Sequence, residues 1–312
     1  MTARAVLITG ATGKQGGAVV SALLKANADF EILALTRDVQ SASAQRLAQK
    51  SPKIKLVAGD MDAADTIFRN AKVITKTPIW GVFSVQAAMG GGANPRKEEF
   101  QGKALIDASL KNGVKHMVYS SVDRGGARSD NDPTDVPHFV SKHNIEKHLQ
   151  EKTQSGEMGW TILRPVAFFE NLTPNFFGKV FATSWKINLK PDQKLQLVAT
   201  SDIGFFAAEA LRKPEEWKGK KLSLAGDELT YEQFAAVFKQ KTGNDLPTTY
   251  HFVATLINWM SKELGSMFRW FRNVGYGADI TSLRRMNPAL KDFGTWLETD
   301  SQFKTRETSN NH

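Results

Sequence analysis

The sequence predicts an α/β protein with a doubly wound parallel sheet, followed by a smaller mixed α/β region. Two observations predict this fold. Short apolar runs alternate with helical patterns through the first half of the chain, and these runs lack the polar alternation of a strand that faces water. Buried strands joined by helices make right-handed crossovers in a parallel sheet. With 312 residues, of which 41% are hydrophobic, the chain can build one large or two modest domains.

Six apolar runs in the first half have the length of a strand. They cover residues 5–8, 32–35, 54–58, 80–83, 116–119 and 160–163. Each of the first five is followed by a stretch in which apolar residues have helical spacing. These stretches cover residues 18–24, 42–48, 63–68, 100–110 and 139–149. Because strand and helix alternate up to Pro165, we expect residues 1–165 to form the first domain.

The pattern changes after Pro165. Residues 166–312 are expected to form a smaller C-terminal region that packs on the first domain. Short strands are expected at 195–199 and 222–225, with a helix at 201–211 between them. No flexible linker separates the two parts of the sequence, so we expect a single lobed unit.

Two further helices are expected near the C-terminus. One begins at Thr230, because Thr230 and Gln233 have the spacing of a capping box. The other is a single helix whose apolar face contains Ile257, Met260, Leu264, Met267, Phe268 and Phe271. Together with Trp259 and Trp270, its Met and aromatic side chains are expected to form core and the wall of a cleft. A groove for a protein partner is the alternative.

The charge of the chain narrows the classes of partner. Lys and Arg number 41 against 32 Asp and Glu, which gives a formal net charge of +9. However, no helix-turn-helix, zinc-finger or basic–aromatic pattern appears, and no apolar run reaches the ~18 residues of a membrane span. We therefore expect neither nucleic acid nor a membrane as a direct partner. The expected location is the cytoplasm, with the nucleus as a second compartment.

The absence of cysteine excludes several kinds of site. A disulfide framework, a cysteine nucleophile and a cysteine-ligated zinc all need cysteine, and the chain has none. The histidines also lack the spacing of metal ligands, so we expect no metal site.

The strongest motif is a glycine-rich loop between the first strand and the first helix. It consists of Gly10, Ala11, Thr12, Gly13, Lys14, Gln15 and Gly16. The first glycine permits a tight turn, the second lets the backbone approach a pyrophosphate, and the third lets the helix pack closely on the strand. The helix N-terminus then attracts phosphate. The loop predicts a dinucleotide site on a Rossmann sheet, with an ordinary glycine-rich turn as the alternative.

The end of the second strand indicates which dinucleotide binds. An NAD site usually places Asp or Glu there to hold the ribose 2′-hydroxyl, whereas this strand ends in Thr36-Arg37. A guanidinium can hold a 2′-phosphate with two hydrogen bonds, and Lys14 can reach the same phosphate. We therefore expect NADP(H) in preference to NAD(H). The alternative for Arg37 is a solvated loop cation beside Asp38.

Other residues at the ends of strands are candidates for the rest of the dinucleotide. Asp60 can accept a hydrogen bond from the adenine amino group, with Met61 against the ring, or it can cap the next helix. The segment Ser84, Val85 and Gln86 ends the fourth strand and is expected near the pyrophosphate and the nicotinamide ribose. The loop 90–92 is expected to be a flap over the cofactor or a spacer.

Several of these motifs resemble the NmrA-like family of atypical short-chain dehydrogenase relatives. The family includes a fungal nitrogen-metabolism repressor and an animal NADPH sensor. The similar segments are Gly10–Gly17, Thr36-Arg37, Gly59–Asp62, Phe168–Asn171, Gln101–Lys103, Met267–Arg269, Asn287–Leu290 and Trp296–Glu298. The resemblance covers nearly the whole chain.

The resemblance implies an NADP(H)-binding fold and a set of cofactor-binding residues. Lys142 is implied to reach the hydroxyls of the nicotinamide ribose. The other implied residues are Gly10 to Gly16, Arg37, Asp60, Met61, Asp62, Ser84, Val85, Gln86, Pro165, Phe168, Phe169, Glu170 and Asn171. One position departs from the sensor branch, which has a basic residue where this chain has Phe100. Lys97 lies one helical turn earlier, and the resemblance implies no role for it.

The sequence leaves two functions open. Typical short-chain dehydrogenases use Tyr-x-x-x-Lys, but the residue four before Lys142 is His138. One hypothesis is therefore a redox sensor or transcriptional regulator that reads the NADPH/NADP level through its conformation and a regulatory protein partner. The other is an NADPH-dependent reductase of a small carbonyl, quinone or enone. Its proton would come from Lys142, or from His138 with Ser120 or Ser121.

Overall fold

The computed structural model describes residues 4–87 and 94–306. They divide into two units, which we describe separately. The first unit contains residues up to 122 together with 140–164 and 203–222. The second contains residues 123–139, 165–202 and those from 223 onward. Each unit therefore draws on chain from both sides of Pro165, where the sequence predicts the boundary between the cofactor-binding and C-terminal regions.

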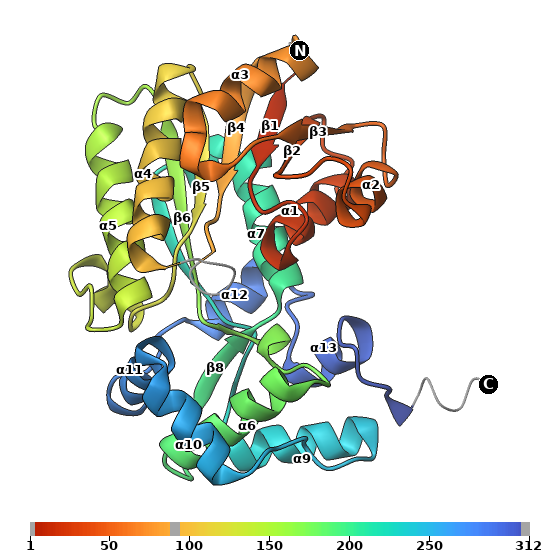
Figure 1. Cartoon of the computed structure of the whole chain (residues 1–312), viewed down its shortest axis with the longest axis vertical. Coiled ribbons are helices and arrows are strands. Elements are labelled where there is room, and N and C mark those ends of the chain that lie inside the picture. The colour runs from red at the N-terminus through yellow and green to blue at the C-terminus, as the bar shows by residue number, and fades with distance from the viewer. Residues whose placement is uncertain (1–3, 88–93, 307–312) are drawn as a thin grey trace. The chain divides into compact units, whose positions relative to one another are not determined.

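A seven-stranded sheet organises the first unit and confirms the predicted α/β fold (Figure 1). Its strands are β1 (Ala5–Ile8), β2 (Glu31–Thr36), β3 (Ile54–Ala58), β4 (Ile79–Ser84), β5 (His116–Ser120), β6 (Gly159–Pro165) and β9 (Lys220–Leu224). The order across the sheet is β3-β2-β1-β4-β5-β6-β9. Pairing is parallel from β3 to β6. The order reverses between β1 and β4, so a crevice forms at the carboxyl ends of these strands.

Helices connect the strands of this sheet. They are α1 (Lys14–Lys25), α2 (Ala42–Ala48), α3 (Ala64–Ile74), α4 (Pro95–Lys111), α5 (Pro137–Lys152), α7 (Thr200–Arg212) and α8 (Pro214–Trp217). The short 3₁₀ helix η1 (Met61–Ala63) precedes α3. The N-terminal ends of α5 and α7 and the C-terminal ends of β6 and β9 belong to the second unit.

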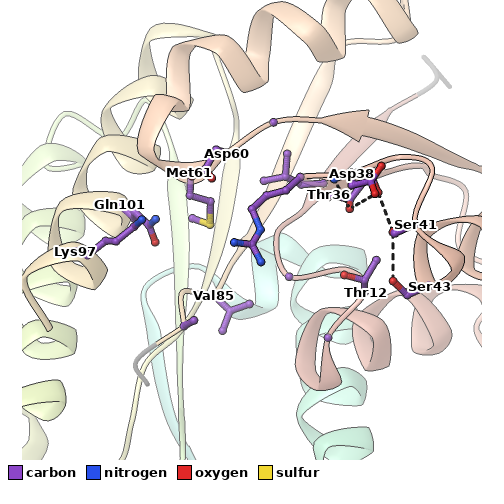
Figure 2. Close-up of a pocket in the computed structure, with 16 residues that line it drawn as sticks. Thr12, Thr36, Asp38, Ser41, Ser43, Asp60, Met61, Val85, Lys97 and Gln101 are labelled. Carbon is purple, nitrogen blue, oxygen red and sulfur yellow. Dashed lines mark hydrogen bonds between the residues drawn. The ribbon is translucent and has the colours of Figure 1, made fainter. Parts of the chain in front are cut away.

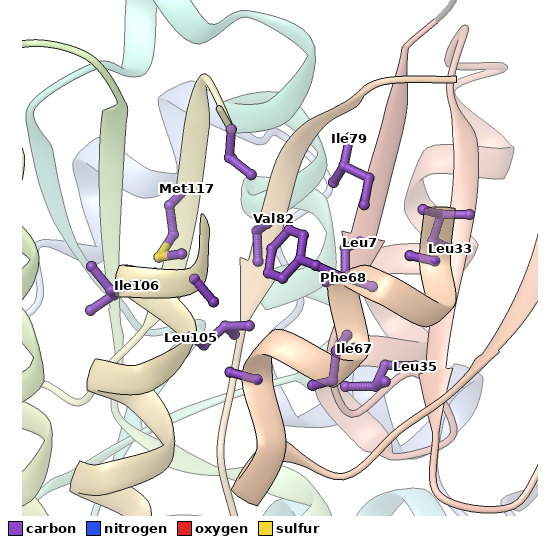
Figure 3. Close-up of a cluster of buried hydrophobic side chains, with 14 of the residues drawn as sticks. Leu7, Leu33, Leu35, Ile67, Phe68, Ile79, Val82, Leu105, Ile106 and Met117 are labelled. Carbon is purple, nitrogen blue, oxygen red and sulfur yellow. The ribbon is translucent and has the colours of Figure 1, made fainter. Parts of the chain in front are cut away.

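One face of the sheet carries a large apolar core. Leu7 and Met117 point from the strands toward Phe68 of α3 and Ile106 of α4 (Figure 3). These side chains are at most 1% exposed, so this face of the sheet is closed to water. The continuous apolar runs in the sequence reflect this burial.

The other face is covered by α1 and α7. These two helices approach so closely at Gly204 that an added Cβ would lie 2.6 Å from the backbone of Ala18. A glycine is therefore required at this position for the two helices to pack at this distance.

A three-stranded mixed sheet lies in the second unit. It has the order β10-β8-β7, in which β10 (Asp227–Leu229) is antiparallel and β7 (Ala167–Phe168) parallel to β8 (Leu195–Val198). The 3₁₀ helices are η2 (Gly126–Asp130) and η3 (Phe169–Asn171). The α-helices are α6 (Phe176–Asn188), α9 (Tyr231–Thr242), α10 (His251–Met260), α11 (Lys262–Asn273), α12 (Ile280–Met286) and α13 (Phe293–Thr299).

Two predictions about the late helices have different outcomes. The capping box is confirmed, since the Thr230 hydroxyl accepts from the Gln233 backbone and the Gln233 side chain accepts from the Thr230 backbone. The single helix over residues 257–271 is wrong. The chain ends α10 at Met260 and begins α11 at Lys262, with Ser261 as the cap between them.

This break also changes the predicted burial of the aromatic and Met residues. Phe268, Trp270 and Phe271 of α11 are buried, as predicted for core residues. Trp259 and Met260 of α10 are 81% and 71% exposed, so they are not core. The apolar spacing in the sequence continues across Ser261, but the chain changes direction at this residue. The apolar residues of α10 and those of α11 therefore do not lie on one common face.

Within residues 4–87 and 94–306, no helix has the length and apolar content that a membrane crossing needs.

Candidate functional site

A cavity of about 580 Å³ opens at the carboxyl edge of the sheet in the first unit. Figure 2 shows it between the loop after β2 and the start of α4. It lies beyond the ends of β1, β2, β3 and β4, where a doubly wound sheet binds ligands. Several of the residues predicted from the sequence line it together, namely Gly10, Thr12, Gly13, Arg37, Asp60, Met61 and Val85.

The glycine loop has the backbone geometry that its motif predicts. Gly10 has a φ of +59°, which L side chains rarely adopt. A Cβ on Gly16 would lie 2.4 Å from the backbone oxygens of both Gly10 and Thr9, so α1 could not pack this close to β1 with any side chain there. Gly13 is the N-cap of α1 and also lines the cavity, which places the positive end of this helix at the cavity wall.

Two polar contacts hold the loop against the sheet. The buried Thr9 hydroxyl lies 3.1 Å from the Phe83 carbonyl and accepts from the Val85 backbone at 2.8 Å, which ties the ends of β1 and β4 together. Gln15 accepts a hydrogen bond of 2.6 Å from the Ser120 hydroxyl of β5. The predicted binding residue Gln15 is thus fixed by a strand two positions away in the sheet.

Arg37 is the cationic residue at the end of β2. It is exposed and lines the cavity, and no residue in the described part of the chain forms an ion pair or hydrogen bond with its guanidinium. The neighbouring Asp38 accepts from the Gln40 backbone at 2.8 Å, so one of its oxygens is already engaged in the loop. The guanidinium is thus available for a ligand.

A second cation lines the cavity on the side opposite to Thr12 and Ser43 (Figure 2). Lys97 of α4 forms an ion pair with Asp62, at 2.7 Å between Nζ and Oδ2. Gln101, one turn later, donates to Asp62 Oδ1 at 2.7 Å. These contacts lower the pKa of Asp62, chiefly through the hydrogen bond with Lys97, and raise the pKa of Lys97. The positive charge of Arg37 lowers the pKa of Lys97 slightly, because both cations line the same cavity.

Asp60 and Met61 follow β3 at the cavity. Asp60 caps η1 by accepting from the Asp62 backbone at 2.9 Å, which is the helix-cap role considered for it from the sequence. Its predicted contact with adenine stays a prediction, and so does the contact of Met61.

The end of β4 presents one half-buried wall residue and two buried polar ones. Val85 lines the cavity, whereas Ser84 and Gln86 are buried and joined by a hydrogen bond of 2.9 Å. The side-chain carbonyl oxygen of Gln86, Oε1, has no hydrogen-bond partner among the described residues. The predicted flap at 90–92 lies outside the described residues.

Lys142 is held by a carboxylate that no pattern in the sequence predicts. Its Nζ lies 2.8 Å from Oε1 of Glu98, a fully buried residue of α4. The hydroxyl of Ser141 donates to the other oxygen of Glu98. The Lys142 ammonium also lies 6.0 Å from the centre of the Tyr119 ring. Lys142 therefore has a fixed and buried position on α5, in contact with a carboxylate.

The other residues considered for proton transfer have partners of their own. His138 belongs to the second unit, where its Nδ1 lies 2.6 Å from Glu263 Oε2. The Ser121 hydroxyl donates to the buried Glu146, which also accepts from Arg164 at 2.6 Å and 3.1 Å. Among the described residues, no group of three or more His, Asp and Glu side chains is placed to hold a metal ion.

The segment 168–171 lies in the second unit, just after Pro165 at the end of β6. Phe169 is fully buried and stacks on Phe293 and Trp296. Glu170 accepts from the backbone and hydroxyl of Thr200, at 2.9 Å and 2.7 Å, at the start of α7. This segment therefore has a structural role in the second unit.

Lys97, Ser41, Ser43 and Glu98 were not assigned from the sequence. The first three line the cavity, and Ser41 was signalled only by its position as the cap of α2. Lys97 could have been found from the sequence, because it lies one helical turn before Phe100, the position at which the sensor branch has a basic residue. Nothing in the sequence marks Glu98, because its partner lies 44 positions later and a glutamate in a polar helix segment is usually exposed.

Comparison with known proteins gives the family. The model of the NmrA-like family matches residues 2–298. An NmrA-like family domain-containing oxidoreductase of Aspergillus hancockii is 26% identical over 259 residues, which cover 78% of this chain and 73% of the relative.

Two solved structures share the fold. One is Nmra, a negative transcriptional regulator in complex with NAD, with a TM-score of 0.69, 17% identity and 96% coverage of both chains. The other is an NADPH-dependent quinone oxidoreductase of Escherichia coli in complex with NADPH, with a TM-score of 0.70, 21% identity and coverage of 94% of this chain and 98% of the other. With the family model matching almost from end to end, this chain belongs to the NmrA-like family.

Proposed function

We propose that this chain binds NADP(H) in the cavity at the carboxyl edge of the seven-stranded sheet and acts as a regulator that responds to the bound dinucleotide. One observation carries the binding proposal. The N-terminus of α1 and the guanidinium of Arg37 meet at the same cavity, so two sites for anionic groups lie on one ligand-sized space.

The residues present fit a dinucleotide. The missing side chain at Gly13 leaves the start of α1 open to a pyrophosphate. The side-chain carbonyl oxygen of Gln86 is buried without a partner in the described ranges, between the cavity-lining residues Val85 and Ala87, and it can accept from a ligand amide or hydroxyl. A bound nicotinamide cofactor supplies or accepts hydride.

NADP(H) is proposed over NAD(H) because of the charge around the adenosine end of the cavity. Arg37 stands where an NAD site carries an acid, and Lys97 adds a second cation across the cavity. A dianionic 2′-phosphate is favoured by both cations, whereas a neutral 2′-hydroxyl gains little from them. Asp60 and Met61 are proposed to contact adenine.

The remaining contacts are proposed from position and from the family resemblance. Lys142 is proposed to donate to the ribose hydroxyls of the nicotinamide half while Glu98 holds its ammonium in place. The resemblance adds Pro165, Phe168 and Asn171, together with Phe169 and Glu170, whose side chains also have structural contacts in the second unit.

A regulatory role is supported by the chemistry around Lys142. The usual tyrosine is absent four residues earlier, and His138 at that position pairs with Glu263. The Lys142 ammonium is itself paired with Glu98. Since binding without turnover needs no proton donor, these contacts suit a protein that reads NADP(H) through its conformation and a protein partner.

A reductase is the second candidate. It is supported by the relative and the structural neighbour that are named as oxidoreductases. In this candidate, Lys142 would donate a proton to the carbonyl, quinone or enone oxygen of the substrate, and Glu98 would hold the ammonium in position.

One experiment separates the two candidates. Purified protein is mixed with NADPH and a panel of carbonyls, quinones and enones, and NADPH absorbance is followed over time. The regulator proposal expects tight NADPH binding, no turnover, and altered hydrogen exchange in the chain when NADPH is added. Turnover that is lost in Lys142→Ala, with NADPH binding retained, would instead establish the reductase.

A further inference from the structure

The outward face of α10 is apolar. Phe252, Leu256 and Trp259 have the spacing i, i+4, i+7 and therefore share one side of the helix. They are 70%, 51% and 81% exposed, and the one buried residue of α10, Ala254, lies on the opposite side. Tyr250, which is stacked on Phe252, is also largely exposed.

This exposed apolar surface, which we call the α10 patch, is larger than single surface aromatics explain. Its members are Tyr250, Phe252, Leu256, Trp259 and Met260. At about 150–250 Å² for an aromatic side chain, the three aromatic members alone expose roughly 450 Å², and Leu256 and Met260 add to this area. The largest apolar patch on an ordinary monomer is roughly 300–600 Å², so a patch of this size points to a binding surface.

The helix that carries the α10 patch is packed closely against α11 and is hydrogen-bonded to α6. The next helix, α11, approaches α10 so closely at Gly265 that an added Cβ would lie 2.6 Å from the Asn258 carbonyl. The Asn258 side chain accepts from the Ser184 hydroxyl of α6 at 3.2 Å. The apolar side chains therefore project from helices that are packed on each other.

The helices around the patch are basic. Lys262, Arg269 and Arg272 have the spacing i, i+7, i+10 on α11, are all exposed, and begin two residues after Met260. On α6, Lys179 and Lys186 are exposed and seven residues apart. The sole acid within α6, α10 and α11 is Glu263, whose carboxylate pairs with His138. These three helices thus carry much of the positive excess of the chain.

We propose that α10 and α11 form an interfacial element that lies on an anionic lipid surface, with the α10 patch inserted and the basic residues of α11 at the headgroups. Trp and Tyr favour the membrane interface, and Lys and Arg bind acidic headgroups. Four side chains of the patch are 70–81% exposed and project outward from the protein. This arrangement suits insertion among lipids better than the lining of a peptide-binding groove. A second copy of the chain is disfavoured, because a symmetric contact would oppose like charges.

This proposal departs from the expectation that the chain has no membrane partner. That expectation rested on the lack of a spanning segment, whereas a helix that lies in the interface needs no such length. The sequence pattern predicted that Trp259 and Met260 are buried, whereas both are exposed in the structure. Their exposure is what makes membrane contact through α10 possible.

Vesicle binding tests the proposal on the full chain. We expect co-sedimentation with phosphatidylcholine vesicles that contain about 30% phosphatidylserine, little with phosphatidylcholine alone, and a marked loss as salt is raised. On binding, the fluorescence of the protein should shift to shorter wavelength, and this shift should be absent from Trp259→Phe.

Paired variants locate the surface. Phe252→Ala with Trp259→Ala should weaken binding more than about tenfold, whereas Phe100→Ala, an exposed aromatic on α4, should not. Arg269→Gln with Arg272→Gln should weaken binding about tenfold or more, whereas Lys72→Gln with Lys76→Gln should weaken it less. Circular dichroism checks that every variant is folded.

Three outcomes would overturn the proposal. The first is equal binding to neutral and anionic vesicles, or none to either. The second is binding that the α10 variants leave unchanged while the controls weaken it. The third is a folded protein whose α10 variants change only its oligomeric mass or its affinity for an acidic amphipathic peptide, which would assign the patch to a second copy or to a protein.

Discussion

Gly16 shows how one absent side chain can determine a site. The residue is buried at the start of α1, and its backbone passes beside the carbonyl oxygens of Gly10 and Thr9. Backbone atoms on both sides cannot move away without opening the loop after β1. The glycine therefore sets the distance between α1 and the sheet, and through it the position of the helix N-terminus at the cavity.

We expect Gly16→Ala to destabilise the fold by about 2–4 kcal/mol, because the new Cβ would lie 2.4 Å from two backbone oxygens. Urea unfolding measures this change. Gly17→Ala is the matched control, because its Cβ would lie 3.3 Å from the Ala11 carbonyl and alanine favours the helix. Equal stability of the two variants would contradict the proposed close approach.

Glu98 is a second residue whose role depends on burial. It is fully buried and receives both the Lys142 ammonium and the Ser141 hydroxyl. Removing the charge of one partner in a buried ion pair leaves the other without compensation. The contact with Glu98 therefore orients Lys142. The stability of the first unit also depends on this contact.

For Glu98→Gln we expect a loss of about 3–5 kcal/mol in the free energy of unfolding. The control Glu99→Gln removes a partly exposed carboxylate that pairs with Lys103 at 2.5 Å, and should cost no more than about 1 kcal/mol. Urea titrations of both variants check this difference. A Glu98→Gln protein as stable as Glu99→Gln would show that the buried pair contributes little.

At the scale of elements, the sequence predicted most strands and helices because each has a local signal. The apolar runs correspond to β1 through β6, and the capping box of α9 is present as predicted. The break between α10 and α11 was missed. The apolar spacing is preserved across Ser261, and only the extended backbone of that residue, with a φ of −98° and a ψ of 100°, turns the chain.

The start of α7 illustrates a helix end that depends on a distant residue. Glu170 accepts from the Thr200 backbone and hydroxyl and from the Trp296 indole at 3.2 Å. It joins three segments of the second unit that are far apart in sequence. No local pattern before α7 reveals this contact, because the carboxylate comes from 30 residues earlier.

Replacing Glu170 by alanine is expected to destabilise the protein by about 1–3 kcal/mol, since a backbone N–H, a hydroxyl and an indole N–H all lose their acceptor. Glu228→Ala removes an exposed glutamate that has a 3.7 Å ion pair with Lys194 and accepts from Gln196 at 3.2 Å, and should change stability by less than about 1 kcal/mol. Thermal melts followed by circular dichroism compare the two. A Glu170→Ala melt indistinguishable from that of Glu228→Ala would refute the capping role.

At the scale of the whole molecule, two buried groups make stability depend on pH in opposite directions. Burial lowers the pKa of His116 to about 4, with Lys218 adding to the shift. Burial raises the pKa of Asp202 to about 6, against the hydrogen bond from the Lys291 backbone. Between pH 4 and 6.5 the unfolded state binds more protons at His116, so this residue stabilises the fold less as pH falls. Asp202 has the reverse effect between about pH 4 and 6.

The His116→Gln variant isolates the first effect. A glutamine amide can still donate to the Thr161 hydroxyl, which lies 3.0 Å from His116 Nε2, but it does not titrate. We expect the wild type to lose up to about 3 kcal/mol relative to this variant as pH falls from 6.5 to 4. Urea unfolding across this range measures the difference. A gap that does not change with pH would mean that His116 is not held neutral.

The candidate site was only partly predictable. The glycine loop and Arg37 follow from the order strand, loop, helix, because the carboxyl ends of neighbouring parallel strands meet at one edge. Lys97 and Glu98 are adjacent on α4, yet one lines the cavity and the other is fully buried. Which of two adjacent charged residues points inward depends on how α4 packs on the sheet and on α5, and a single sequence does not contain that information.

The most direct test of the proposed function is calorimetric titration of the protein with NADPH and with NADH. We predict one NADPH per chain, bound more tightly than NADH. In Arg37→Gln we predict a loss of about tenfold or more in NADPH affinity with NADH affinity unchanged. The exposed Arg46→Gln on α2 serves as the control and should behave as wild type. Absence of NADPH binding, or equal affinity for both cofactors that Arg37→Gln leaves unchanged, would contradict the proposal.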